Sequence, residues 1–315
     1  MLDQTTPTLQ SMQKSIHSAI QLIETIIVGK PDQIKLAVCC LLSAGHCLIE
    51  DLPGVGKTTL SHALARVFGL NFSRIQFTSD LLPADILGVS IFDPQAQQFN
   101  FHPGPIFSNC VLADEMNRAT PKTQSALLEA MEERQITIDG STKILQQPFF
   151  VIGTQNPLDQ SGTFPLPESQ LDRFMMKLNL GYPDEKAERQ LLAGQSRQHL
   201  IQNLQPAITT ENLIHLQNAV EGIHASEALL DYVQLLVAET RNKEFFVYGL
   251  SPRAALSLLK AARAWALMNA RDFVEPGDIK AVFSAISSHR LIPTEQHSTD
   301  AASLVDKLLQ QIAIP

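Results

Sequence analysis

The sequence DLPGVGKTT at residues 51–59 decides the fold of this chain. It follows the apolar run HCLIE and opens a segment with helical periodicity, so it is expected to join a buried strand to a helix. Gly54 and Gly56 let backbone N–H groups turn toward an anion where a side chain would obstruct them. Lys57 places a positive charge near β- and γ-phosphates, and the Thr58 hydroxyl can bind Mg²⁺. The stretch therefore predicts a phosphate-binding loop.

One position of the loop departs from the general pattern G-x-x-x-x-G-K-[ST], because Asp51 stands where the first glycine is usual. The mechanism does not depend on that glycine, since the tight curvature is needed at Gly54 and Gly56. The alternative interpretation is a glycine-rich turn with an exposed lysine, but the strand before it and the helix after it favour the phosphate loop. The residues expected to bind nucleotide here are Pro53, Gly54, Val55, Gly56, Lys57, Thr58 and Thr59.

A second motif, CVLADE at residues 110–115, is four apolar residues that end in two carboxylates. Open α/β sheets place their ligands at the carboxyl ends of strands. Asp114 is expected to hold Mg²⁺ through its water shell, and Glu115 to polarise the attacking water as a general base. An acidic pair at a strand end is usually a solvated turn, but the phosphate loop upstream favours the functional interpretation. The predicted cofactors are ATP or ADP and Mg²⁺, with Thr58 and Asp114 as the metal-binding residues.

Three further residues are candidates for the chemistry. Asn156 follows the apolar strand VIGTQ, so its side chain could reach the γ-phosphate, although Asn-Pro is also an ordinary turn signal. Arg173 in ESQLDRF is either a surface ion-pair partner or an arginine finger inserted into an adjacent subunit. In GLSPRAAL, Ser251 suits a helix N-cap and Pro252 the first helical position. Arg253 then lies in the first turn, which disfavours a cation unless an anion, such as a nucleotide phosphate, is near.

The rest of the N-terminal part alternates between strands and helices, which predicts a parallel sheet in an α/β domain. An amphipathic helix is expected over about residues 9–27 and a mostly apolar one over about 32–42. The expected strands are HCLIE, SRIQF, NCVLAD, FFVIGTQ and MMKLNL. Two β-hairpins are expected at residues 88–105 and 134–148, because alternating stretches there are split by Asp-Pro and Asp-Gly.

From about Pro183 to the end the chain is predicted to be helical, so we expect an α/β domain at 1–182 and an all-α domain at 183–315. A chain of 315 residues with 44% hydrophobic residues is long enough for two cores. The net charge of -8 offers no overall basic field, so nucleic acid is not an expected partner. The longest apolar run, LAVCCLL, is too short for a membrane span, which needs ~20 residues. The N-terminus has no pattern of a signal peptide. A cytoplasmic protein is predicted.

Together, DLPGVGKTT, VLADEMNRA, the NP after a strand, LPESQLDRF and GLSPRA resemble the MoxR family of AAA+ ATPases. The resemblance covers the chain from about Ile27 to the end of the second domain. It implies an AAA+ P-loop core with a five-stranded parallel sheet in the order 5-1-4-3-2. It also implies a hairpin inserted in the second helix, another hairpin before sensor 1, and a C-terminal helical lid.

The same resemblance assigns roles to single residues. It makes Lys57 and Thr58 the Walker A pair, Asp114 and Glu115 the Walker B pair, Asn156 sensor 1, Arg173 the arginine finger and Arg253 sensor 2. Val28 and Gly29 fall where relatives contact adenine, with Lys30 in place of the usual glutamine. The family further implies a homo-oligomeric ring, usually a hexamer. Its members are regarded as chaperone-like enzymes that remodel or activate protein partners, often ones with von Willebrand factor A domains.

Two alternatives stay open at this point. A magnesium-chelatase ATPase subunit or a helicase of the same clade would share the hairpins, but the acidic charge disfavours a helicase and the motif DEMNRA disfavours the chelatase. A binding switch that holds ATP with little turnover is a rival from another class. Glu115 and Arg173 argue against it, because a pure switch has less need of a base and a finger.

Overall fold

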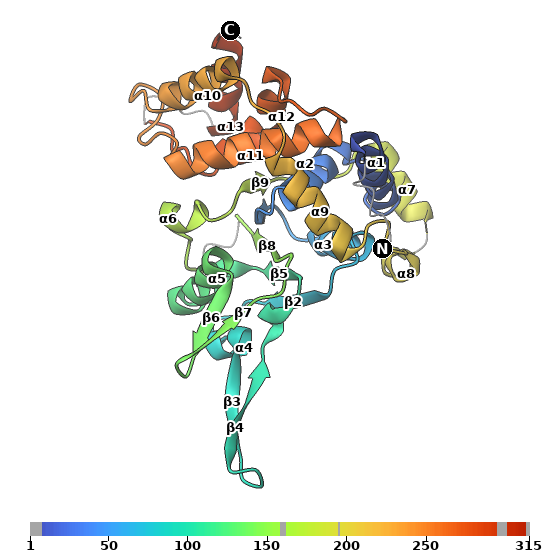
Figure 1. The fold of residues 1–315 in the computed structure, drawn as a ribbon, viewed down its shortest axis with the longest axis vertical. Helices are drawn as coiled ribbons and strands as arrows, with labels where there is room; N and C mark the ends of the chain where they lie inside the picture. Colours follow the sequence, from blue (N-terminus) through green and yellow to red (C-terminus); the bar gives the residue numbers. More distant parts are fainter. Residues whose placement is uncertain (1–7, 158–161, 195, 295–300, 313–315) are drawn as a thin grey trace, which may run out of the picture.

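The computed structural model describes residues 8–157, 162–194, 196–294 and 301–312. Its centre is a five-stranded sheet, with a long hairpin projecting from one end of the molecule and a group of helices at the other (Figure 1). The strands are β1 (Cys47–Glu50), β2 (Phe72–Gln76), β5 (Cys110–Asp114), β8 (Phe150–Gln155) and β9 (Met176–Leu178). They are all parallel and lie in the order β2-β5-β8-β1-β9. The predicted order 5-1-4-3-2 is confirmed, because these are the first to fifth strands of the sheet along the chain.

The central strands are buried on both faces, as expected for a parallel sheet covered by helices. Successive side chains point to opposite faces, so Leu48 and Val111 belong to one apolar cluster while Ile49 and Leu112 belong to the other. The first cluster lies under α4 (Pro83–Leu87) and α5 (Pro121–Glu133). The second is shared with the helices α1 (Leu9–Ile26), α2 (Pro31–Leu42) and α3 (Lys57–Val67) and with the C-terminal helices.

Both predicted hairpins are present. The first pairs β3 (Gly88–Asp93) with β4 (Gln98–Pro103), and the second pairs β6 (Gln135–Ile138) with β7 (Ser141–Ile144). The turn of the second hairpin has positive φ at both central residues, +50° at Asp139 and +74° at Gly140. That is the pairing which a two-residue turn between twisted strands requires. The β3–β4 hairpin extends far from the sheet (Figure 1).

The chain after β9 is helical in its described residues. The helices are α7 (Glu185–Ala193), α8 (Arg197–Asn203), α9 (Thr210–Glu221), α10 (Glu227–Thr240), α11 (Pro252–Met268), α12 (Pro276–Ser287) and α13 (Ala301–Gln311). Helix α11 packs against α12 and α9 and also against α1 and α2, so these C-terminal helices, called the lid below, share a core with the N-terminal helices. The division near Pro183 stays a prediction. Among the described residues, none of the helices combines the length and apolarity needed to cross a bilayer.

Candidate functional site

The predicted phosphate loop connects β1 to α3. Gly56 is the N-cap of α3 and has φ +100°, and Gly54 has φ +84°. A Cβ atom at either position would meet no other atom within 4 Å, so the left-handed backbone rather than crowding makes glycine necessary there. The helix therefore begins at Lys57 with its free N–H groups at the loop, which is the geometry that binds an anion.

Lys57 is 9% exposed, and its Nζ donates a hydrogen bond of 2.5 Å to the carbonyl oxygen of Asp51. Burial lowers the pKa of Lys57, while the negative charges of Asp51, Asp114 and Glu115 act in the opposite direction. All three carboxylates lie close enough to act on the lysine. The structure thus brings the loop lysine and the acidic pair of β5 together, as the sequence predicted.

Asp51 has a role that the sequence did not indicate. Its Oδ1 accepts a hydrogen bond from the N–H of Leu52 at 2.8 Å, and its Oδ2 accepts one from the N–H of Gly181 at 2.6 Å. Lys30 reaches the same stretch, because its Nζ donates to the carbonyl oxygen of Tyr182 at 2.6 Å. The start of the phosphate loop is therefore tied to the segment that leads from β9 into the lid.

Asp114, the last residue of β5, is held through both carboxylate oxygens. Its Oδ1 accepts from the Thr154 hydroxyl at 2.6 Å, and its Oδ2 accepts from Nη2 of Arg74 at 2.6 Å. Thr154 also accepts the backbone N–H of Glu115 at 2.9 Å, so β8 fixes the acidic pair. The Thr58 hydroxyl and the Asp114 carboxylate are hard oxygen donors of the kind that Mg²⁺ prefers. Such a pair suffices for an ion that takes its remaining ligands from phosphates and water.

Glu115 has φ +58°, a left-handed conformation that is uncommon for a residue other than glycine and is concentrated at functional sites. Its Oε2 accepts a hydrogen bond from Nε2 of Gln76 at 2.8 Å and forms an ion pair with Arg118 at 2.9 Å. Arg74 and Gln76 are two residues apart on β2, so both side chains lie on the face that meets the acidic pair. No motif in the sequence pointed to Arg74, Gln76 or Thr154.

Asn156 follows the last residue of β8 and is 9% exposed. Strand β8 lies between β5 and β1, so this position is between the strand end that carries the acidic pair and the one that leads into the phosphate loop. Its role at the γ-phosphate stays a prediction.

The two predicted arginines, Arg173 and Arg253, form ion pairs with the same carboxylate, that of Glu132 in α5. Arg173, between α6 (Glu168–Leu171) and β9, places its Nε 3.3 Å from Oε2 of Glu132 and donates from Nη1 to the carbonyl oxygen of Leu128 at 2.7 Å. Arg253, in the first turn of α11, places its Nη1 3.2 Å from Oε1 of Glu132. Their side chains are 30% and 43% exposed. Within the described residues, the anion beside Arg253 is this glutamate.

The predicted residues that line a cavity fall into two groups, and Lys57, Asp114 and Glu115 are in neither of them. Val28, Gly54 and Gly56 line a cleft at the phosphate loop together with Arg197 of the lid. Gly29 adjoins this cleft and has φ +75°, and a Cβ there would come within 2.8 Å of Ala187. Neither Arg173 nor Arg253 lines that cleft. Both line a second cavity, with Glu132, Arg134, His46 and Asp172 among its other residues.

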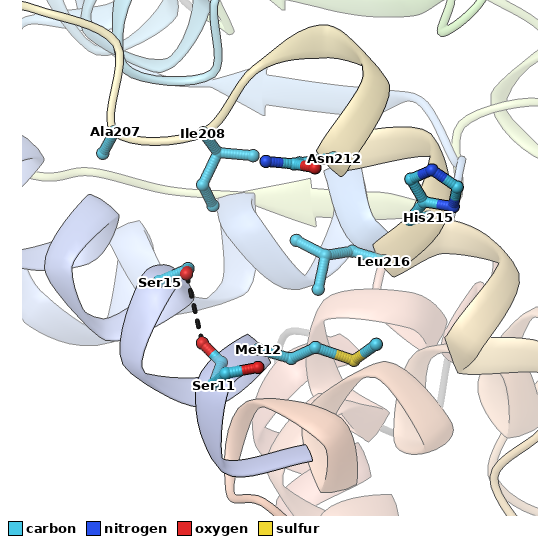
Figure 2. Close-up of a pocket in the computed structure, with 8 residues that line it drawn as sticks. All are labelled: Ser11, Met12, Ser15, Ala207, Ile208, Asn212, His215 and Leu216. Carbon is cyan, nitrogen blue, oxygen red and sulfur yellow. Dashed lines mark hydrogen bonds between the residues drawn. The ribbon is translucent and has the colours of Figure 1, made fainter. Parts of the chain in front are cut away.

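A third cavity lies between α1 and α9 (Figure 2). Met12 and Leu216 lie across from each other there, with the Ser11 and Ser15 side chains on the α1 side. Its lining contains neither a carboxylate nor a lysine or arginine, and its one titratable side chain is His215. The lining residues are Ser11, Met12, Ser15, Ala207, Ile208, Asn212, His215 and Leu216.

Comparisons with known proteins agree with this geometry. Residues 46–176 match the family model of the ATPases associated with various cellular activities (AAA), and residues 238–309 match the AAA lid domain. The chain is 44% identical over 310 residues to the protein YeaC of Bacillus subtilis, covering 96% of this chain and 97% of that protein. It is 40% identical to the chaperone MoxR1 of Mycobacterium tuberculosis, covering 96% and 82% of the two chains. A crystal structure of a candidate ATPase from Cytophaga hutchinsonii superposes with a TM-score of 0.88 at 36% identity, covering 98% and 97%.

Proposed function

Because the chain belongs to the MoxR family of AAA+ ATPases, we propose that it hydrolyses ATP with Mg²⁺ as a ring of identical subunits and thereby remodels or activates a protein partner. The observation that carries the ATPase part is that β1 and β5, which flank β8 in the parallel sheet, end at the same edge, so the charges of Asp114 and Glu115 act on Lys57. Lys57 would lie against the phosphates, and Thr58 with Asp114 would hold Mg²⁺, which would supply charge neutralisation at the transferring phosphoryl group. Glu115 takes the proton of the attacking water, and Asn156 orients that water.

A ring is supported by the position of the arginines. Arg173 and Arg253 line a cavity with Gly45 and His46, which precede β1, whereas the phosphate loop follows β1, so the two sites lie at opposite ends of that strand. The two guanidinium groups are partly exposed and share Glu132. Cations in that position suit the phosphates of an adjacent copy, and each subunit would then complete the site of its neighbour. The proposed ring is a hexamer, following the family.

A protein client is supported by the hairpins. They carry large apolar side chains that are at least 40% exposed, namely Val89, Ile91, Phe92, Phe99 and Ile144. Exposed aromatic and aliphatic groups of this kind mark surfaces that bind other proteins. We propose a client such as a protein with a von Willebrand factor A domain, in the cytoplasm, and no nucleic acid, since the net charge is -8.

A binding switch with little turnover is a second candidate, and one observation favours it. Both members of the acidic pair already have cationic partners, Asp114 with Arg74 and Glu115 with Arg118. These ion pairs compete with metal and water for the two carboxylates, and that competition would slow turnover.

The experiment that separates the two is steady-state phosphate release from Mg-ATP, measured per protomer over a range of protein concentrations. The ring predicts that specific activity rises with concentration and that added Arg173→Ala subunits lower the activity of wild-type subunits. The Lys57→Ala protein serves as the background. ATP binding without phosphate release at any concentration, together with inert mixing, would support the switch instead.

A further inference from the structure

One buried arginine of the lid forms hydrogen bonds with the segment 172–175, which contains Arg173 and leads into β9. Arg290 follows α12, and its side chain is 5% exposed. Its Nε donates to Oδ1 of Asp172 at 2.6 Å, and its Nη2 donates to the carbonyl oxygens of Phe174 at 2.7 Å and Asp172 at 3.2 Å. Its Nη1 donates to the carbonyl oxygen of Met175 at 3.0 Å and also to that of Ile286 in α12.

This arrangement fixes a backbone path rather than a single contact. A guanidinium has five N–H donors in one rigid plane, and here all three of its nitrogens donate to the segment 172–175. A buried cation is costly unless it is paired and hydrogen-bonded, and Asp172 supplies the opposite charge. A lysine at this position would keep the charge but could not reproduce the planar set of donors.

The lid holds the same segment through two more contacts. Nε2 of His289 lies 3.0 Å from the carbonyl oxygen of Phe174. The Ser251 hydroxyl donates to Oδ2 of Asp172 at 3.3 Å, and Ser251 is the N-cap of α11, the helix whose first turn carries Arg253. Asp172 therefore connects the backbone of Arg173 to the start of α11 and to the end of α12.

We propose that Arg290 is a positioning residue that fixes, from the lid, the backbone that presents Arg173 to a second copy of this chain. The inference rests on the proposed function, because the action of Arg173 in a neighbouring site is itself part of that proposal. The consequence is that a subunit with a defective Arg290 keeps its own nucleotide site but fails to complete the site of its neighbour.

The first test compares Arg290→Lys with Arg271→Lys. Arg271 is a matched control, since it is also a lid arginine, is 21% exposed and pairs with Asp278 through both Nη atoms, but is not among the groups that contact the segment 172–175. We expect Arg290→Lys to lower phosphate release about tenfold or more, because a small misplacement of a catalytic group has effects of that size. Affinity for fluorescent ADP should be unchanged, and Arg271→Lys should keep its activity.

The second test uses mixtures with Glu115→Gln subunits, which lack the base but carry an intact Arg173 and Arg290. In a random equal mixture with Arg290→Lys, about a quarter of the interfaces join an intact Glu115 to an intact arginine segment. The mixture should therefore be at least about 2.5-fold more active than Arg290→Lys alone, because a quarter of wild-type activity compares with about a tenth, and the ratio rises if the loss exceeds tenfold. A protein that is merely destabilised would also bind less fluorescent ADP when measured alone.

A reference mixture of Arg173→Ala with Glu115→Gln separates the possible failures. Recovery in the reference, with none in the Arg290→Lys mixture, would overturn the role of Arg290 and leave the shared site standing. No recovery in the reference would overturn the shared site and with it this inference. Asp172→Asn, which removes only the charge that Arg290 faces, should show the same loss and the same recovery if Arg290→Lys does not fold.

Discussion

The phosphate-loop region and the arginine region hold their cations in different ways. Lys57 is 9% exposed and has a fixed partner in the Asp51 carbonyl, with three carboxylates nearby. Arg173 and Arg253 are partly exposed and share the single carboxylate of Glu132. A charge in a buried setting acts strongly on a ligand, whereas exposed ion pairs are weak and can exchange partners. Under the proposed function, the first region binds nucleotide within its own subunit, and the second exchanges its internal anion for a phosphate of an adjacent copy.

The largest expected effect separates binding from turnover. Arg173→Ala should lower the turnover number about 10³-fold or more, as loss of an arginine finger does, and leave ATP affinity unchanged. Lys57→Ala should instead abolish nucleotide binding, because the phosphates lose their buried counter-charge. Fluorescent-nucleotide titration and phosphate release on both proteins check this difference. Equal losses of ATP affinity in the two variants would show that the regions form one site within a subunit.

The next effect concerns the base. Glu115→Gln should bind ATP normally but hydrolyse it about 10²- to 10⁴-fold more slowly, since a general base contributes that much. Single-turnover hydrolysis measures the chemical step directly. Glu129→Gln, on the exposed side of α5, is the control and should behave as wild type. Near-normal turnover of the Glu115 variant would move the base elsewhere.

The two regions also differ in how far they could be predicted from the sequence. The phosphate loop and the acidic pair are contiguous motifs, each with its own strand, and the structure places them together as predicted. Thr154 and Gln76 were missed because their contacts depend on which strands are neighbours, and nothing in a single strand marks that. The helix-start pattern at Arg253 predicted a nearby anion from local backbone charge alone. It could not identify Glu132, which lies on a helix from a distant part of the chain.

The same limit explains why Arg290 was missed. Its partner Asp172 is 118 residues away in the sequence, and no local periodicity links them. The sheet order and both hairpins were predicted because the family resemblance and the Asp-Gly and Asp-Pro turns indicate them directly. Tertiary contacts between the lid and the segment 172–175 have no such local signal.

A smaller effect concerns the free energy of unfolding, which should depend on pH through the buried His46. His46 lines the cavity that also contains Arg173 and Arg253. Its Nδ1 accepts the backbone N–H of Val151 at 3.0 Å, and its Nε2 lies 3.1 Å from the carbonyl oxygen of Met131. Burial lowers the pKa of His46 from 6.5 to about 4. The unfolded chain therefore binds the proton more tightly, so stability is full above pH 6.5 and is lost as the pH falls toward 4.

For this one histidine the free energy of unfolding should fall by about 2 kcal/mol between pH 7 and pH 5. Urea denaturation at the two pH values measures the fall. His46→Gln can keep a donor and an acceptor without titrating, so its stability should change less over the same interval. The buried His289, whose pKa burial also lowers, is present in both proteins and cancels in the comparison. Equal changes in the two proteins would mean that His46 is not the group that titrates.

The smallest effect addresses the exchange of anions directly. Glu132→Gln removes the charge that holds both Arg173 and Arg253, and each exposed pair contributes only about 0.2–1 kcal/mol. Releasing the two guanidiniums should therefore lower, by about two- to tenfold, the protein concentration that gives half-maximal ATPase activity. Glu133→Gln is the matched control, because it removes the same charge one residue away on a side chain that faces solvent. Glu132→Gln could instead raise that concentration or abolish activity at saturating protein. Either result would mean that Glu132 holds the arginines in their working geometry, and Arg173 and Arg253 would then be fixed in place as Lys57 is.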